Sequence, residues 1–207
     1  MSLCHIETLD NFFQLQLTSG DATNRLTRAG VAEVTNAIER LAADPRPLVI
    51  TGNPKFFSAG ADLREIAALT GPEAYEFSQM GRRLMSAVES FPAPVYAAIH
   101  GYCMGGGLDL ALACHHRIAS PHAVFGHRGA ALGLITGWGG TQRLSRLLGK
   151  AKALEMFVAA EKLHAYDAWK IGLVNEVAED PVGEAAARIA FHQEAQRARE
   201  NRTEQQL

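Results

Sequence analysis

The sequence has little of what stabilises a secreted disulfide scaffold or anchors a chain in a membrane. Its 207 residues include three cysteines, Cys4, Cys103 and Cys114, an odd number without metal-ligand spacing. We therefore expect reduced thiols in a cytoplasmic protein. No apolar run is long enough for a membrane span. Asp10 and Asn11 interrupt the stretch where the apolar part of a signal peptide would lie, so none is expected.

Neither sign of charge dominates the chain. Twenty Lys and Arg residues face 22 Asp and Glu residues, for a net charge of −2. This balance gives no electrostatic case for nucleic acid or an anionic membrane as partner. The length fits one domain that can bury a substantial core.

In the first half of the chain, strand-like and helix-like segments alternate. Residues 12–17 alternate apolar and polar side chains, as in a half-buried strand. Thr27 is a plausible N-cap for an amphipathic helix, and residues 48–50 form a short apolar strand pattern. A second helix begins at residues 71–72, and the apolar residues 94–99 form a further strand. Alternating strands and helices predict an α/β fold with right-handed βαβ units and a largely parallel sheet.

The second half repeats the alternation less regularly. We expect strands at residues 116–119, 123–125 and 173–177, and helices at residues 141–148 and 150–160. From Ala185 onward the composition becomes polar and charged, which is typical of a solvated helix or a frayed tail.

A glycine turn is the most informative local feature. Residues 105–107 are three glycines between a strand pattern and a helix pattern, and Asp109 follows within a turn. Backbone N–H groups at such a turn add to the positive end of the helix dipole and can stabilise an oxyanion. A second glycine-bearing loop, residues 52–62, also leaves a predicted strand. Ligands of parallel sheets sit beyond the carboxyl ends of strands, so we expect both loops to meet at one site.

Five motifs, in this order, carry a resemblance to a known family. They are FSAGADL at residues 57–63, AIHGYCMGGG at 98–107, FG at 125–126, GGTQRL at 139–144 and AWKIGLVN at 168–175. Their order and spacing from about residue 12 to residue 177 resemble the enoyl-CoA hydratase/isomerase (crotonase) family.

The resemblance implies a crotonase-like spiral of ββα units that binds acyl-CoA thioesters. It implies an oxyanion hole made by the backbone N–H groups of Ala61 and Gly106. Backbone at Ala59, Asp62 and Leu63 would border the coenzyme A part of the substrate. No separate cofactor is implied, since coenzyme A belongs to the substrate, and the family forms trimers or hexamers of identical chains.

The acid–base pattern departs from the family. Its hydratases use two glutamates, and the first maps onto Asp109, a carboxylate shortened by one methylene or about 1.5 Å. The second maps onto Gly129, which has no side chain. Asp109 remains the candidate acid/base, and the two-glutamate hydration mechanism is not expected. Asp109 also fits a purely structural role as a carboxylate favoured by the helix dipole.

Neighbouring residues offer substitutes for the missing glutamate. His127 can act as an acid or base near neutral pH, and it equally fits a buried polar wall. Arg128 can hold a substrate carboxylate, or it can be a surface cation. Trp138 is expected to line or underlie the acyl pocket.

The resemblance also sets expectations for domains. Residues 1–180 would form the acyl-CoA-binding core, and residues 181–207 a short polar helix or tail. Family members normally continue into further C-terminal helices, so that region is expected to be shortened, whether by nature or by truncation.

These features predict an enoyl-CoA hydratase or isomerase that stabilises a thioester enolate, with Asp109 as acid/base. Two alternatives stay open at this point. One is a decarboxylase or hydrolase of a carboxylated acyl-CoA, using Arg128 and His127. The other is a catalytically reduced subunit that binds CoA thioesters.

Overall fold

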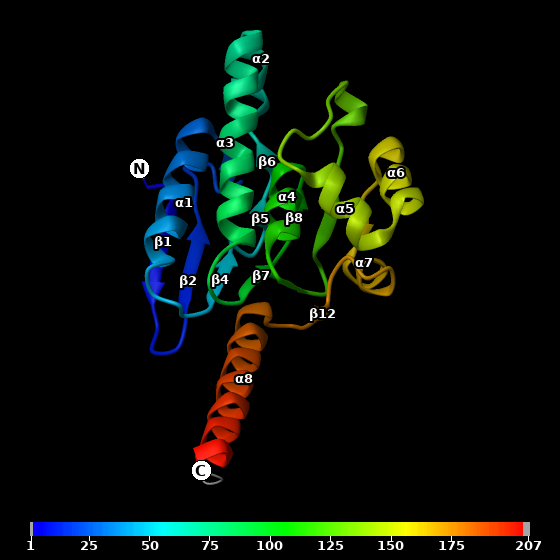
Figure 1. Cartoon of the computed structure of the whole chain (residues 1–207). Coiled ribbons are helices and arrows are strands. Elements are labelled where there is room, and N and C mark those ends of the chain that lie inside the picture. The colour runs from blue at the N-terminus through cyan, green and yellow to red at the C-terminus, as the bar shows by residue number, and fades with distance from the viewer. Residues whose placement is uncertain (1, 205–207) are drawn as a thin grey trace.

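A six-stranded sheet runs through the centre of the computed structural model, which describes residues 2–204 (Figure 1). Its first two strands pair antiparallel, and all the later neighbours pair parallel. The largely parallel α/β sheet expected from the sequence is therefore confirmed. In spatial order the strands are β1 (Cys4–Thr8), β2 (Phe13–Leu17), β4 (Leu48–Thr51), β7 (Val95–Ile99), β9 (His116–Ala119) and β12 (Glu176–Val177).

Two smaller sheets flank the main one. A four-stranded sheet has the order β11-β10-β8-β5, and β3 pairs with β6. These strands have two or three residues, too few to show an alternating pattern in the sequence. Their bounds are β3 (Arg25–Leu26), β5 (Phe56–Ser58), β6 (Gly60–Ala61), β8 (Tyr102–Met104), β10 (Val124–Gly126) and β11 (Leu163–His164).

One strand was not expected from the sequence, and one expectation needs correction. The helix begins at the glycine turn as expected, but β8 lies between that turn and the strand that ends at Ile99. Of the strand expected at residues 173–177, only residues 176–177 are extended, as β12. Its first part is a turn, in which the N–H groups of Leu173 and Val174 donate to the carbonyl of Ala168. Apolar composition alone did not distinguish this buried turn from a strand.

Eight α-helices and one 3₁₀ helix, η1, lie among the described residues. The N-cap of the first is confirmed, since the hydroxyl of Thr27 accepts a hydrogen bond from the N–H of Gly30 at 3.0 Å. The helices are α1 (Arg28–Leu41), α2 (Leu63–Ala68), α3 (Gly71–Glu89), α4 (Gly106–Ala113), η1 (Ala130–Leu132), α5 (Gly140–Leu148), α6 (Lys150–Ala159), α7 (Ala165–Lys170) and α8 (Pro181–Glu204).

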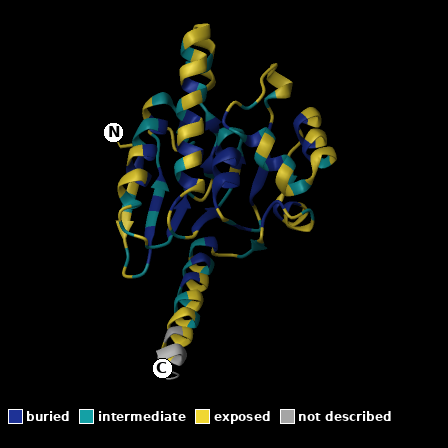
Figure 2. Cartoon of the chain, viewed as in Figure 1, coloured by how far each residue is buried: buried dark blue, intermediate teal, exposed yellow. Residues whose placement is uncertain are grey.

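Alternation along the strands divides the core between the two faces of the sheet. Leu48 and Ile50 of β4 belong to the large cluster that includes residues of α1, α3 and α4. Val49, between them, belongs to a smaller cluster with Ala185 and Ile189 of α8. The start of α8 thus covers the second face, while its far end is largely exposed (Figure 2). Residues 205–207 of the expected C-terminal segment lie outside the described residues.

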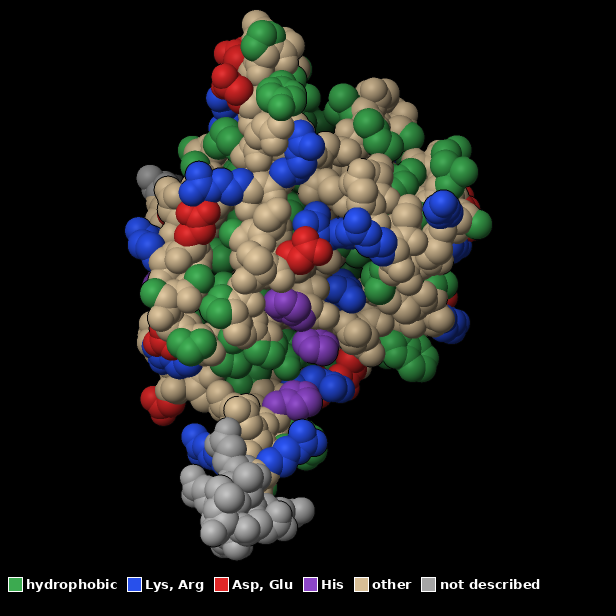
Figure 3. All heavy atoms as spheres, in the orientation of Figure 1, with side chains coloured by type: hydrophobic (Ala, Val, Ile, Leu, Met, Phe, Trp, Pro, Cys, Tyr) green, Lys and Arg blue, Asp and Glu red, His purple; other side chains and the backbone are tan. Residues whose placement is uncertain are grey.

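The surface carries both signs of charge. On the face in Figure 3, basic and acidic side chains lie side by side, in keeping with the small net charge. No helix among residues 2–204 is long and apolar enough to cross a membrane.

All three cysteines are free thiols inside the fold. Burial raises the pKa of the Cys114 thiol to about 12. Burial, together with the nearby Glu33 carboxylate, raises the pKa of Cys4 to about 11. Burial also raises the pKa of Cys103 well above its usual range. Each thiol is therefore held in its protonated, unreactive form.

We expect the folded protein to react slowly with an aromatic disulfide reagent. At about pH 8, a thiol with a pKa near 11 is roughly one part in a thousand thiolate. Absorbance of the released thiol should show little reaction of the native chain and three equivalents after unfolding in guanidinium. Rapid reaction of one native thiol would contradict the burial of the cysteines.

We expect Leu84→Ala to lower the free energy of unfolding by about 2–5 kcal/mol, because Leu84 of α3 is completely buried and its loss leaves a cavity. The matched control is Leu154→Ala on α6, where the side chain is 63% exposed. That change should stay within about 0.5 kcal/mol. Urea unfolding of both variants measures the difference, and equal losses would contradict the assigned core.

Candidate active site

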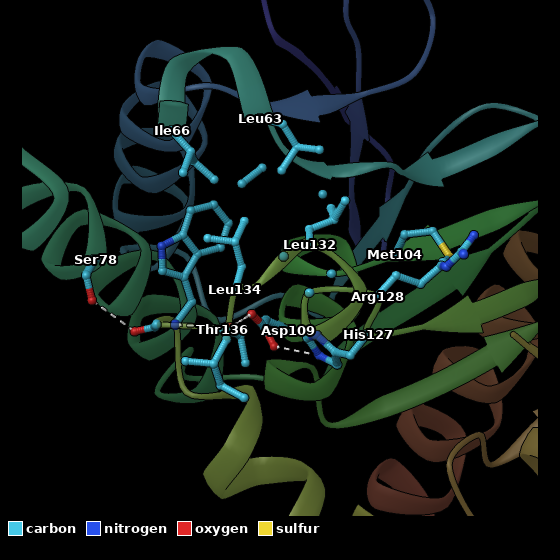
Figure 4. Close-up of a pocket in the computed structure, with 18 of the residues that line it drawn as sticks. Leu63, Ile66, Ser78, Met104, Asp109, His127, Arg128, Leu132, Leu134 and Thr136 are labelled. Carbon is cyan, nitrogen blue, oxygen red and sulfur yellow. Dashed lines mark hydrogen bonds and ion pairs between the residues drawn. The ribbon is translucent and has the colours of Figure 1, made fainter. Parts of the chain in front are cut away.

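A cavity of about 340 Å³ opens over the N-terminus of α4, between α2 and α3 on one side and the loop after β10 on the other (Figure 4). Both glycine-bearing loops reach it from the carboxyl ends of β4 and β7, which confirms that they converge. Most of its lining is apolar. The lining residues are Ala59, Gly60, Ala61, Leu63, Ile66, Leu69, Ala74, Phe77, Ser78, Met104, Gly105, Gly106, Asp109, His127, Arg128, Gly129, Leu132, Leu134, Ile135, Thr136, Gly137 and Trp138.

The glycine turn places backbone at the cavity floor. Gly105 has φ +50°, a conformation that side chains disfavour. Gly106 is the first residue of α4, so its N–H has no intrahelical acceptor. A Cβ at Gly106 would overlap the ring of Trp138, which packs edge-on against Phe77 at 5.2 Å between ring centroids. Only glycine lets the backbone approach this buried ring so closely.

The second loop meets the first at Gly60 and Ala61. These two residues form β6, which pairs with β3. A Cβ at Gly60 would lie 3.1 Å from the N atom of Gly106 and 2.6 Å from the carbonyl oxygen of Met104. The backbones of β6 and of the α4 N-terminus are therefore in direct contact, and both Ala61 and Gly106 line the cavity.

Asp109 is a fully buried carboxylate one turn into α4. Its Oδ2 accepts a short hydrogen bond from the hydroxyl of Thr136, which itself accepts from the N–H of Trp138 at 3.3 Å. Its Oδ1 lies 3.0 Å from Nε2 of His127. A Cβ on Gly140 would overlap that same Oδ1. The carboxylate is thus enclosed by a hydroxyl, an imidazole and bare backbone.

His127 follows β10 directly and is also buried, with 4% of its surface exposed. Its ring packs against Phe157 of α6 at 4.9 Å between centroids. The close contact with Asp109 is not an aligned hydrogen bond, since Nε2 and Oδ1 each lack a hydrogen-bond partner in the described part of the chain. Such pairs in ligand-free sites are often poorly aligned and tighten when substrate binds.

Gly129, where the family resemblance predicts that a glutamate is missing, lies in a tight loop. The carbonyl of Gly129 accepts hydrogen bonds from the N–H groups of Leu132 and Leu134, each at 2.8 Å. A Cβ on Gly129 would lie 2.6 Å from the carbonyl oxygen of Leu134. The loop therefore has no room for a side chain here. Leu132 and Leu134 line the cavity beside it.

The remaining predicted site residues divide between the cavity and its edge. Ala59, Leu63 and Trp138 line it, and Trp138 is buried. Arg128 also lines it, but its side chain is exposed (Figure 4). Asp62 lies outside the lining and caps α2, where its Oδ1 accepts from the N–H groups of Arg64 and Glu65.

Thr136 is the site residue that sequence reasoning missed. Neither its type nor its position in the loop indicated a contact with Asp109, 27 residues earlier. Ile66 of α2 and Phe77 of α3 form part of the apolar wall of the cavity. A clearer signal of close packing lay in Gly139 and Gly140 at the start of α5. The absence of a side chain at Gly140 leaves space for the buried carboxylate of Asp109.

The family model for enoyl-CoA hydratase/isomerase matches residues 7–202 of the chain. A probable enoyl-CoA hydratase from Bacillus subtilis is 40% identical over 175 residues, which are 83% of this chain and 68% of that protein.

Solved structures show the same likeness. Pseudomonas aeruginosa DspI superposes with a TM-score of 0.87 at 35% identity, over 92% of this chain and 74% of that one. The enoyl-CoA hydratase from Bacillus anthracis superposes with a TM-score of 0.85 at 34% identity, over 91% of this chain and 76% of that one. The expected crotonase-like fold is therefore confirmed.

We expect Gly140→Ala to destabilise the protein by about 1–3 kcal/mol, because the added methyl group would displace the buried carboxylate of Asp109. The matched control is Gly71→Ala at the start of α3, where a Cβ would meet no atom within 4 Å. That variant should be neutral or slightly stabilised. Thermal unfolding compares the two, and equal melting temperatures would contradict the described packing around Asp109.

Proposed function

The chain belongs to the enoyl-CoA hydratase/isomerase family, and on this basis we propose that it moves a proton on the acyl chain of an enoyl-CoA thioester by way of an enolate. The observation that carries the proposal is the Asp109–His127 pair, buried at the floor of an apolar cavity beside free helix N–H groups. An acid–base pair and oxyanion donors are the two elements that enolate chemistry requires.

The backbone N–H groups of Ala61 and Gly106 are proposed to hold the thioester oxygen. The contact between β6 and the start of α4 supports this role, because it brings both residues to one cavity. Removal of a proton from the acyl chain places negative charge on that oxygen. Loss of one such donor typically costs about 10²–10³ in rate.

The Asp109–His127 pair is proposed to act as the acid/base. A buried carboxylate beside an imidazole stabilises the imidazolium that forms when the pair accepts a proton. Proton transfer by a positioned side chain contributes about 10²–10⁴ in rate.

The geometry at Gly129 favours isomerisation of the double bond. A shift of the double bond takes a proton from one carbon and returns it to another, so one acid–base pair suffices. Hydration also needs a group that holds the water, and the backbone and side chain of Leu134 occupy the space where a side chain at Gly129 would lie. Hydration is the second candidate, favoured by the names of the Bacillus relatives, which are enoyl-CoA hydratases.

The two other hypotheses receive less support. Arg128 points its exposed side chain toward Met104 and away from Asp109, so a carboxylated acyl group has no buried cation to meet (Figure 4). A subunit that only binds thioesters would not need a carboxyl group and an imidazole buried together at the cavity floor, since burying polar groups costs free energy.

Further proposals follow from family membership. The ligand is an acyl-CoA, with coenzyme A as part of the substrate and no separate cofactor. The chain is proposed to assemble with copies of itself, as a trimer or hexamer, and to work in the cytoplasm.

We expect the purified protein to exchange the α-protons of butyryl-CoA with D₂O, because enolate formation alone is enough for exchange. Mass spectrometry measures the deuterium gained. We also expect turnover of a 3-enoyl-CoA that exceeds hydration of crotonyl-CoA, both followed by absorbance of the conjugated thioester.

Faster turnover of crotonyl-CoA would identify hydration as the reaction and overturn the preference for isomerisation. Calorimetric binding of acyl-CoA without exchange or turnover would contradict the proposed function and favour a binding subunit.

A further inference from the structure

Asp109 and His127, the buried pair at the cavity floor, differ in how far each can be reached from the cavity. This inference rests on the proposed proton transfer and concerns which of the two side chains meets the substrate. Family resemblance assigns that task to Asp109. The accessible surfaces of the two side chains in the structure assign it otherwise.

The carboxylate of Asp109 has no accessible surface, although its residue borders the cavity. Thr136 covers Oδ2, while Nε2 of His127 and the backbone of Gly140 cover Oδ1. Asp109 is also one methylene shorter than the glutamate whose place it takes. A substrate carbon cannot approach either oxygen without displacing one of these groups.

The two ring nitrogens of His127 have different surroundings. Nε2 is fully buried and faces Asp109. Nδ1 makes no hydrogen bond among the described residues. Unlike Nε2, it is not among the fully buried polar atoms that lack a partner there. It therefore retains accessible surface, and His127 lines the cavity (Figure 4).

The groups packed around His127 leave Asp109 as its charged partner. Phe157 of α6 packs its apolar ring against the imidazole, and the uncharged hydroxyl of Thr136 contacts Asp109. Arg128, next in sequence, is exposed to water.

We infer that His127 is the group that takes and returns the substrate proton, through Nδ1, and that Asp109 is a positioning residue. Neutral His127 carries its proton on Nε2, toward Asp109, and its Nδ1 lone pair accepts a proton from an acyl-chain carbon. The electron pair of the broken C–H bond moves into the thioester enolate. The imidazolium then gives the Nδ1 proton to a second carbon as the enolate collapses, so no other reactant is consumed.

Thr136 completes the chain of contacts behind His127. The Trp138 N–H donates to the Thr136 hydroxyl, which donates to Asp109, which faces His127. This chain occupies Oδ2 and leaves Oδ1 for the imidazole. It resembles in logic the carboxylate that fixes the tautomer and orientation of a catalytic histidine.

The direct test is His127→Gln and His127→Ala, assayed on the substrate that the wild-type enzyme turns over. Both variants should lose about 10²–10⁴ in kcat. Added imidazole should restore part of the activity of His127→Ala, because the emptied space adjoins the cavity. The matched control is His122→Ala, an exposed histidine, which should keep wild-type activity with or without imidazole.

Asp109→Asn should also lose activity, but imidazole should not restore it, because His127 still fills its own place. A His127→Gln variant within about threefold of wild type, beside an inactive Asp109→Asn, would overturn the inference and make Asp109 the direct base. Absence of imidazole rescue in a folded His127→Ala would also count against it. A wild-type enzyme without turnover or exchange would instead refute the proposed function.

A second pair of variants tests the positioning role. Thr136→Ser keeps the hydroxyl donor to Asp109 and should stay near wild type. Thr136→Val removes the donor and should lower kcat by roughly 10–100-fold with little change in KM. Equal kcat values for the two variants would show that the hydroxyl does not act through Asp109.

Discussion

A carboxylate buried in an apolar interior is the constraint on which this site depends. Asp109 lies on a helix whose other buried residues are aliphatic or glycine, and an unpartnered charge there would cost several kcal/mol. Three features of the surroundings offset this cost. Thr136 donates a hydrogen bond, His127 brings a group that can become positive, and the start of α4 contributes its dipole. The loop after β10 supplies the first two partners, so the buried charge fixes the course of that loop.

Much of this arrangement can be read from the sequence, because it rests on local rules. Alternation in β2 and the Thr27 cap give a strand and a helix near their observed bounds. The glycine turn and the loop of Ala61 point to one site, since both follow parallel strands. What local rules miss is short or irregular. Short strands such as β6 and β8 are defined by pairing with strands far away in the sequence. The turn before β12 is apolar, but its backbone is not extended.

The chemistry of the site is less predictable than its position. Sequence reasoning named Asp109 and His127 separately, and their 3.0 Å contact appears only in three dimensions. Thr136 has no pattern of its own. Its importance comes from a hydrogen bond across 27 positions of chain. Residue types thus indicate which groups are available, while packing decides which of them are covered and which can reach a ligand.

Gly129 has a consequence for how this site can change during evolution. Two hydrogen bonds close the loop on its carbonyl, and the carbonyl of Leu134 occupies the space of a side chain. A single substitution to glutamate would therefore meet a steric barrier before it offered a second carboxylate. The loop would have to be rebuilt first, so the order of mutations matters. A second carboxylate at this position is therefore more than one mutational step away.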